Sequence, residues 1–256
     1  MTEVAAELVA TAMDYPFSRP DHSYLFVDGE VQALRDPPAE GIDATLSQLS
    51  AAPLSERTAV LAYGANAAPE RLRHKFAAEL PGAVFPVVKA RLFEFDVVYA
   101  CHYSSYGAVP ATLAPSPGTV AEIALTYLDG DQLAHMHETE LSGGSYVYGS
   151  LEDIKVAPEG LATLDKVHSY WTGYGHYSGT SGPIALSAVT AEGRRFAEAA
   201  QVAMQTQALD RLAPDRDLHI FVRENVADPA LRQQRSLALR ADAKPFDHPH
   251  CQIQGG

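Results

Sequence analysis

The pattern of hydrophobic and polar positions changes period several times along the chain. Short alternating or continuous runs of β-branched and aromatic residues predict strands, whereas apolar residues three or four positions apart predict helices. The predicted helices cover residues 3–13, 42–49, 69–80, 131–140, 191–209, 215–224 and 229–239. The predicted strands cover residues 23–27, 30–34, 58–62, 83–88, 90–99, 119–128, 146–156 and 184–189. Strands around single helices, without regular βαβ repeats, favour an α+β fold built on a mixed barrel or sheet.

These elements divide the chain into three predicted parts. Residues 1–57 form an N-terminal extension of helix, β-hairpin and helix, in which Asp28-Gly29 is a strong hairpin turn signal. Residues 58–190 form the main domain, with a turn predicted at 115–118. Residues 191–256 form a C-terminal helical extension that ends in a polar tail from Asp242, which is predicted to be mobile.

The main domain begins with a strand that breaks just before a helix. The strand over residues 58–62 leads into Tyr63-Gly64-Ala65-Asn66, and Pro69 opens the helix. A strand that ends at a glycine before a helix presents backbone N–H groups that could hold a carboxylate or a developing oxyanion. The same residue types also form plain structural turns.

A second candidate lies on the helix predicted over residues 131–140. At helical spacing Glu140 shares a face with Leu133 and Met136, while Glu138 lies on the polar face. A carboxylate carried inward at a helix C-terminus is expected to have a raised pKa, which suits a general acid or base. The alternative is that Glu140 caps the helix or pairs with an arginine.

Composition narrows the classes of partner. The formal net charge of -13 argues against nucleic acid or an anionic membrane as the main partner. Only two cysteines are present, which excludes a disulfide framework. No apolar run reaches the ~18 residues of a membrane span, and the first residues lack a basic region before an apolar core. We therefore expect a cytoplasmic protein.

Three further groups of residues are candidate sites. Cys101 and His102 are adjacent, and neighbours in a strand point to opposite faces and cannot pair directly, so Cys101 is expected to be a core residue rather than a nucleophile. His248, His250 and Cys251 lack a second ligand pair at zinc spacing, and no metal site is predicted. The aromatic and glycine-rich segment 168–182 could be a lid over a site or an ordered loop on the main domain.

The order of motifs over residues 58–156 resembles the γ-glutamylcyclotransferase-like family. The matching pieces are Tyr63-Gly64-Ala65-Asn66, the segment Ala111-Thr112-Leu113-Ala114-Pro115-Ser116-Pro117-Gly118-Thr119-Val120, Glu138-Thr139-Glu140, and Tyr146. Two features depart from the family pattern: Ala65 stands where the family loop usually has Ser, and the spacing between Glu140 and Tyr146 is unusual.

The resemblance implies a small mixed β-barrel that releases 5-oxoproline from a γ-glutamyl amine or peptide, without a cofactor. It implies that Glu140 is the acid/base. Backbone N–H groups of Tyr63, Gly64 and Ala65 would hold the glutamyl moiety, Asn66 would fix the loop, and Tyr146 would line the pocket. The alternatives are a non-catalytic small-molecule or protein binding module on the same fold, and another amide-cleaving reaction. The sequence leaves open whether the C-terminal helices form a homodimer.

Overall fold

The computed structural model describes residues 3–34, 39–179, 182–249 and 251–254. The helices are α1 (Glu3–Met13), α2 (Ala39–Gln48), α3 (Pro69–Phe76), α4 (Gly130–Leu141), α5 (Gln201–Leu212), α6 (Leu218–Ala227) and α7 (Pro229–Leu239). The longer strands are β1 (Tyr24–Val27), β2 (Glu30–Ala33), β3 (Thr58–Ala62), β4 (Val84–Tyr99), β5 (Ala111–Leu128), β6 (Tyr146–Leu151), β8 (Val167–Thr172), β10 (Gly182–Leu186) and β13 (Cys251–Gln254). The short strands are β7 (Val156–Pro158), β9 (Ser178–Gly179), β11 (Ala191–Glu192) and β12 (Ala197–Ala199). The predicted α+β class is confirmed.

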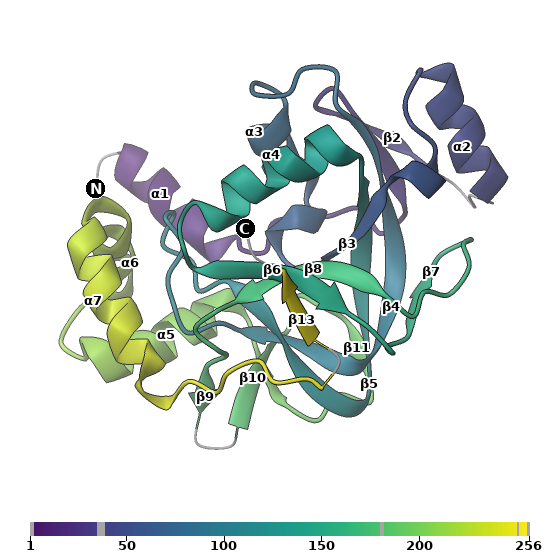
Figure 1. Ribbon diagram of the computed structural model, residues 1–256. Helices are drawn as coiled ribbons and strands as arrows, with labels where there is room; N and C mark the ends of the chain where they lie inside the picture. Colours follow the sequence, from purple (N-terminus) through teal and green to yellow (C-terminus); the bar gives the residue numbers. More distant parts are fainter. Residues whose placement is uncertain (1–2, 35–38, 180–181, 250, 255–256) are drawn as a thin grey trace.

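One large, mostly antiparallel sheet forms the centre of the molecule (Figure 1). Its strand order is β12-β10-β4-β5-β3-β8-β6-β13, with β1, β7 and β11 attached at the side of this path. Among the strand pairs that the described residues form, only β3–β8 and β10–β12 are parallel. Among the described residues no pairing joins β12 to β13, so the structure shows a sheet and does not show the closed barrel that the sequence predicts.

The sheet separates two hydrophobic clusters because successive side chains of a strand point to opposite faces. In β3, Val60 and Ala62 belong to the cluster beneath α3 and α4, whereas Leu61 belongs to the larger cluster on the other face. The smaller cluster holds a group of packed rings. Phe76 of α3 lies with its ring centroid 4.9 Å from that of Phe85 on β4 and 5.1 Å from that of His135 on α4.

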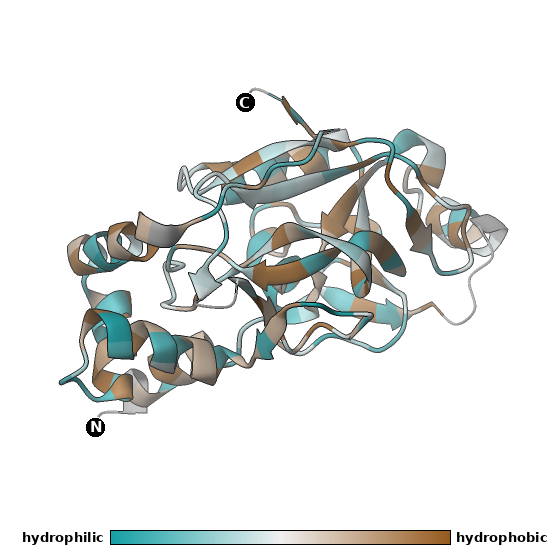
Figure 2. Ribbon diagram, turned by 90° about the horizontal axis from the view of Figure 1, so that it is seen from below, coloured by the Kyte–Doolittle hydropathy of each residue, from teal (hydrophilic) through white to brown (hydrophobic). Residues whose placement is uncertain are grey.

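The terminal segments are part of this architecture. Strand β1 pairs with β4, and β13 pairs with β6, so both ends of the chain extend the central sheet. At one end of the molecule α1 packs on α6, beside α5 and α7 (Figures 1 and 2). Side chains of α1 and α6 share the larger hydrophobic cluster with the sheet. The division at residues 57 and 190 stays a prediction.

The helix predicted over residues 191–209 is wrong in its first half. Residues 191–192 form β11 on β5, residues 197–199 form β12 on β10, and α5 begins only at Gln201. Gly193, with φ +64°, interrupts any helix between these strands. The alanine and glutamate content favours a helix, but pairing with distant strands overrides this local preference.

Three other boundaries also differ from prediction. Residues 84–99 form one strand, with a bulge at Glu94, instead of two. Strand β5 continues through the predicted turn at 115–118, and Gly118 accommodates the bend with φ +81°. The strand predicted over 146–156 splits into β6 and β7 near Asp153, whose φ is +50°.

The tail beyond Asp242 is also more ordered than predicted. Lys244 exchanges backbone hydrogen bonds with His176, and β13 lies along β6. Of the predicted helices, α1 and α7 have the predicted bounds. Among the described residues no helix has both the length and the apolar character needed to cross a membrane.

Phe76 anchors α3 to the sheet and to α4. Its side chain is 0% exposed, so Phe76→Ala removes ring contacts and leaves a cavity. We expect the free energy of unfolding to fall by about 4 kcal/mol, measured by urea denaturation. The control is Val202→Ala on α5, where the side chain is 49% exposed. Equal effects of the two substitutions would contradict this packing role.

Candidate functional site

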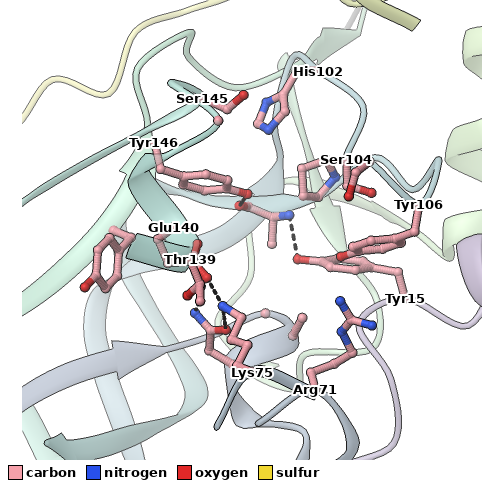
Figure 3. Close-up of a pocket in the computed structure, with 18 of the residues that line it drawn as sticks. Tyr15, Arg71, Lys75, His102, Ser104, Tyr106, Thr139, Glu140, Ser145 and Tyr146 are labelled. Carbon is pink, nitrogen blue, oxygen red and sulfur yellow. Dashed lines mark hydrogen bonds and ion pairs between the residues drawn. The ribbon is translucent and has the colours of Figure 1, made fainter. Parts of the chain in front are cut away.

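A pocket of about 400 Å³ opens where β3 ends and α3 begins. Its wall combines segments that are far apart in sequence: the end of β3, helices α3 and α4, the loop after β4, the start of β5, and a residue that follows α1 (Figure 3). The labelled side chains in Figure 3 converge on one space from these elements. The lining residues used below are Tyr15, Tyr63, Gly64, Ala65, Asn66, Arg71, Lys75, His102, Ser104, Tyr106, Ala111, Glu140, Tyr146 and Tyr170.

Local sequence signals determine where the two helices that border the pocket, α3 and α4, begin. Pro69 occupies the first turn of α3, where its missing N–H costs no helical hydrogen bond. Asp129 caps α4: its Oδ1 accepts from the backbone N of Gln132 at 3.0 Å, and the Gln132 side chain accepts from the backbone N of Asp129 at 3.2 Å. With α4 starting there, its last turn carries Glu140 to the pocket.

Glu140 makes the central polar contact of the pocket. Its Oε1 accepts a hydrogen bond from Asn66 Nδ2 at 3.1 Å and forms a short ion pair with Lys75 Nζ, which also donates to Asn66 Oδ1 at 2.8 Å (Figure 3). The side chains of Lys75 and Glu140 are each 13% exposed. The other carboxylate oxygen, Oε2, accepts no hydrogen bond from the described residues.

The helical periodicity correctly distinguishes the two glutamates of α4. Glu140 is largely buried in the pocket, whereas the Glu138 side chain is 78% exposed. The alternative that Glu140 pairs with an arginine names the right kind of contact and the wrong partner, since the partner is Lys75. The spacing of Arg71 and Lys75, one helical turn apart after the loop, is the signal that could have located both cations.

The predicted loop lines the pocket. The N–H groups of Gly64, Ala65 and Asn66 donate no hydrogen bond to any acceptor in the described part of the chain. Gly64 is needed for a close approach: a Cβ at this position would lie 2.5 Å from the hydroxyl oxygen of Tyr15. The fold thus brings together the predicted site residues of the loop, Glu140 and Tyr146. The roles of these residues stay predictions.

The phenols of the pocket are held by backbone atoms. Tyr146 Oη donates to the carbonyl of Ala111 at 3.5 Å, and Tyr63 Oη donates to the carbonyl of Tyr170. The hydroxyl of Tyr15 accepts from the backbone N of Ala111 at 2.7 Å. Burial raises the pKa of Tyr15, Tyr63 and Tyr146 above the usual range. These hydroxyls therefore stay neutral and can donate hydrogen bonds.

Sequence reasoning missed several pocket residues. Tyr15 comes from the predicted N-terminal extension, and no local pattern marks it as a site residue. His102 lines the pocket, with its ring in edge contact with Tyr146 at 5.5 Å between centroids. Its neighbour Cys101 is buried in the larger hydrophobic cluster, which is consistent with the predicted core role.

Of the other sequence candidates, the aromatic segment reaches the pocket through Tyr170. Most of the aromatic segment 168–182 forms β8 and the chain that follows it, and Tyr170 of this segment borders the pocket. Residues 180–181 and His250 lie outside the described residues. Within the described ranges no group of three His, Cys, Asp or Glu side chains is arranged to hold a metal ion.

Comparisons with known proteins give resemblances in structure. No protein-family model matches the chain, and no curated protein matches it. A solved structure named gamma-glutamyl cyclotransferase is similar with TM-score 0.37 and 16% identity, covering 76% of this chain and 92% of that one. An uncharacterized protein from Homo sapiens is similar with TM-score 0.37 and 17% identity, covering 75% and 91%. A protein from Arabidopsis thaliana has TM-score 0.33 and 16% identity, covering 46% and 69%.

The predicted resemblance to γ-glutamylcyclotransferase-like proteins is confirmed as a similarity to solved structures. Identities of 16–17% and these TM-scores leave the reaction to be inferred from the site itself.

The ion pair between Lys75 and Glu140 predicts strong coupling between the two residues. Lys75→Met leaves a largely buried carboxylate without its cation, and we expect the free energy of unfolding to fall by about 3 kcal/mol. In a double-mutant cycle with Glu140→Gln, the double variant should lose at least about 1 kcal/mol less than the sum of the single variants. Urea denaturation measures all four proteins.

A matched control is Lys166→Met. Lys166 pairs with Glu152 at 2.6 Å, but its side chain is 51% exposed. Because exposed ion pairs contribute little, this change should leave unfolding nearly unaffected. Additive losses in the Lys75–Glu140 cycle would show that the two groups do not interact in solution.

His102 predicts a loss of stability in mild acid. Burial, followed by the charge of Arg240, lowers its pKa to about 3, whereas an unfolded histidine titrates near about 6.5. Between these values the unfolded chain binds more protons than the folded protein, so stability declines as pH falls below about 6.5. Protonation of His102 in the unfolded chain should lower the free energy of unfolding by about 2 kcal/mol at about pH 5 relative to about pH 7.5.

The measurement compares wild type and His102→Gln by urea denaturation at both pH values. The variant should lack the pH-dependent loss that His102 causes, so the difference in stability between the two proteins should change by about 2 kcal/mol. A difference that is the same at both pH values would contradict the buried, neutral state of this ring.

Proposed function

We propose that this protein releases 5-oxoproline from a γ-glutamyl amine or peptide, with Glu140 as acid and base. The observation that carries the proposal is the position of the Glu140 carboxylate in a pocket beside the Tyr63–Asn66 loop, where Oε2 accepts no hydrogen bond from the described residues. A carboxylate with an available oxygen can accept a proton from a bound amine, and the loop offers backbone donors for an oxyanion.

The proposed reaction needs no second substrate. The α-amino nitrogen attacks the γ-carbonyl carbon of the same molecule, a C–N bond closes the five-membered ring, and the bond to the departing amine breaks. Because the nucleophile is tethered to the electrophile, most of the entropic cost of bringing them together is already met. Glu140 takes one proton from the amino group and returns it to the departing amine nitrogen.

The remaining pocket residues have supporting roles in this proposal. Backbone N–H groups at Tyr63, Gly64 and Ala65 hold the glutamyl moiety and the oxyanion. Asn66 fixes the loop and, through its contact with Glu140, the orientation of the carboxylate. Tyr146 lines the pocket (Figure 3).

A second candidate is a non-catalytic binding module. It is favoured by the pairing of Oε1 with both Lys75 and Asn66, since a carboxylate engaged in this way can serve as a fixed structural contact. In that case a γ-glutamyl compound would bind with equal affinity to wild type and Glu140→Gln, and neither protein would form product.

The deciding experiment measures 5-oxoproline by mass spectrometry from a panel of γ-glutamyl amines and dipeptides. Wild type should release 5-oxoproline, and Glu140→Gln should lower kcat/KM at least about 100-fold because it cannot take the proton. The matched control is Glu138→Gln, which changes an exposed carboxylate on the same helix and should keep the wild-type rate. Absence of product from folded wild-type protein across the panel would refute the proposed reaction.

A further inference from the structure

His102 is a buried polar side chain of the pocket that the proposed proton transfer does not use. It lies in the loop after β4, is only 3% exposed, and lines the cavity. In Figure 3 its ring lies at the end of the pocket away from Lys75 and Arg71. A buried polar atom that meets no partner in the protein is costly, so a ligand that supplies the partner gains affinity.

Three neighbours hold the imidazole ring in place. Its centroid lies 5.5 Å from that of Tyr146 and 5.7 Å from that of Tyr174, and both contacts are edge to face. Its Nδ1 lies 3.5 Å from Oγ1 of Thr172 on β8. The other ring nitrogen, Nε2, forms no hydrogen bond with the described residues. The ring is therefore oriented before a ligand binds, with Nε2 left for the ligand.

The hydrogen bonds of Thr172 indicate which nitrogen of His102 carries the proton. Thr172 Oγ1 accepts the backbone N–H of Tyr174 at 3.2 Å, and its own hydroxyl proton is free to go to another acceptor. Within the described part of the chain, His102 Nδ1 is the acceptor that this hydroxyl reaches. A neutral imidazole that accepts at Nδ1 carries its proton on Nε2. His102 thus offers an N–H donor to the pocket.

The surroundings of the ring keep this donor uncharged. Burial, followed by the charge of Arg240, lowers the pKa of His102 to about 3. Arg240 stacks on Tyr174, with its guanidinium carbon 3.2 Å from the ring centroid, and is outside the pocket lining. Tyr146 supplies no negative charge, because burial raises the pKa of its phenol. At neutral pH His102 is a neutral donor, and a neutral imidazole can polarise a carbonyl group.

The distribution of charge along the lining indicates which ligand group suits this donor. Among the described residues of the lining, the charged side chains are Arg71, Lys75 and Glu140. Figure 3 shows both of these cations at the other end of the pocket. A carboxylate next to His102 would meet no cation of the lining, and burying an unpaired charge is costly. An uncharged oxygen costs less to desolvate and accepts a neutral N–H.

We propose that His102 is a ligand-binding residue that donates a hydrogen bond from Nε2 to an uncharged carbonyl oxygen of the molecule in the pocket. This inference rests on the proposed function for the γ-glutamyl class of ligand. Both the location of the ring proton and the binding of a ligand can be measured without turnover.

Nitrogen-15 NMR of the histidine rings tests the donor in the Glu140→Gln protein, and the spectrum of the additional variant His102→Gln assigns the signal. Without ligand we expect a single ring proton, on Nε2. Addition of γ-glutamylalaninamide should move the Nε2–H proton signal downfield and leave Nδ1 unprotonated. A proton on Nδ1 in the free protein, a second ring proton in the complex, or an unchanged signal would overturn the assignment of His102.

Titration calorimetry in the same Glu140→Gln background measures the contribution of the donor to affinity. His102→Leu removes the donor and should weaken γ-glutamylalaninamide binding about fivefold. His102→Gln keeps an N–H donor and should retain most of the affinity.

The matched control is His176→Leu, which changes a histidine that is 8% exposed and outside the pocket lining. It should leave the affinity unchanged. Equal weakening by His102→Leu and His176→Leu, no weakening by His102→Leu, or failure of the compound to bind would contradict the role of His102.

A second compound, γ-glutamylethylamide, identifies the carbonyl that accepts the hydrogen bond. The γ-carbonyl is its only uncharged carbonyl group, whereas γ-glutamylalaninamide has another on the departing amine. Equal weakening of both compounds by His102→Leu would support a bond to the γ-carbonyl. Weakening of γ-glutamylalaninamide alone would support a bond to the carbonyl of the departing amine.

Release of 5-oxoproline by the protein with native Glu140 is measured separately with both compounds. Binding that depends on His102 without any 5-oxoproline would refute the proposed reaction and support the role of His102. Release with the same kcat/KM in wild type and His102→Leu would support the reaction and refute the role of His102.

Discussion

The ion pair between Lys75 and Glu140 is the contact on which the arrangement of the pocket depends. It joins the last turn of α4 to α3, and Asn66 completes it by contacting both partners. Each charged side chain is only 13% exposed, so neither charge is well solvated without the other. The loop, the two helices and the orientation of the carboxylate are therefore determined together.

Hydrophobic packing supports this polar contact from the opposite side of α3. Phe76 and Leu72 are buried in the cluster beneath the helix, which leaves Arg71 and Lys75 directed at the pocket. The N-terminal segment supplies another wall: the Tyr15 hydroxyl meets Gly64 and the backbone of Ala111. A segment that looks like an appendage in sequence thus contributes directly to the candidate site.

Short-range signals predicted those parts of the fold and site that depend on neighbouring residues. The capping residues of α4 and its 3.6-residue period distinguished Glu140 from Glu138, and the glycine after β3 located the loop. The positions of Tyr15 and Phe17 depend on how α1 packs against distant elements, which no local pattern encodes. For the same reason β11, β12 and β13 were missed, since each exists only through pairing with a strand far away in sequence.

The pairing of β13 with β6 also affects how the molecule behaves toward its own copies. A long strand left at the margin of a sheet offers unpaired N–H and C=O groups to any other chain, and this is a route to aggregation. Strand β13 satisfies one side of β6 over residues 148–151. The margin at this side becomes the four-residue strand Cys-Gln-Ile-Gln, a shorter template for intermolecular pairing than the six-residue β6. The C-terminal tail thereby occupies the edge of β6 that another copy of the chain could otherwise pair with.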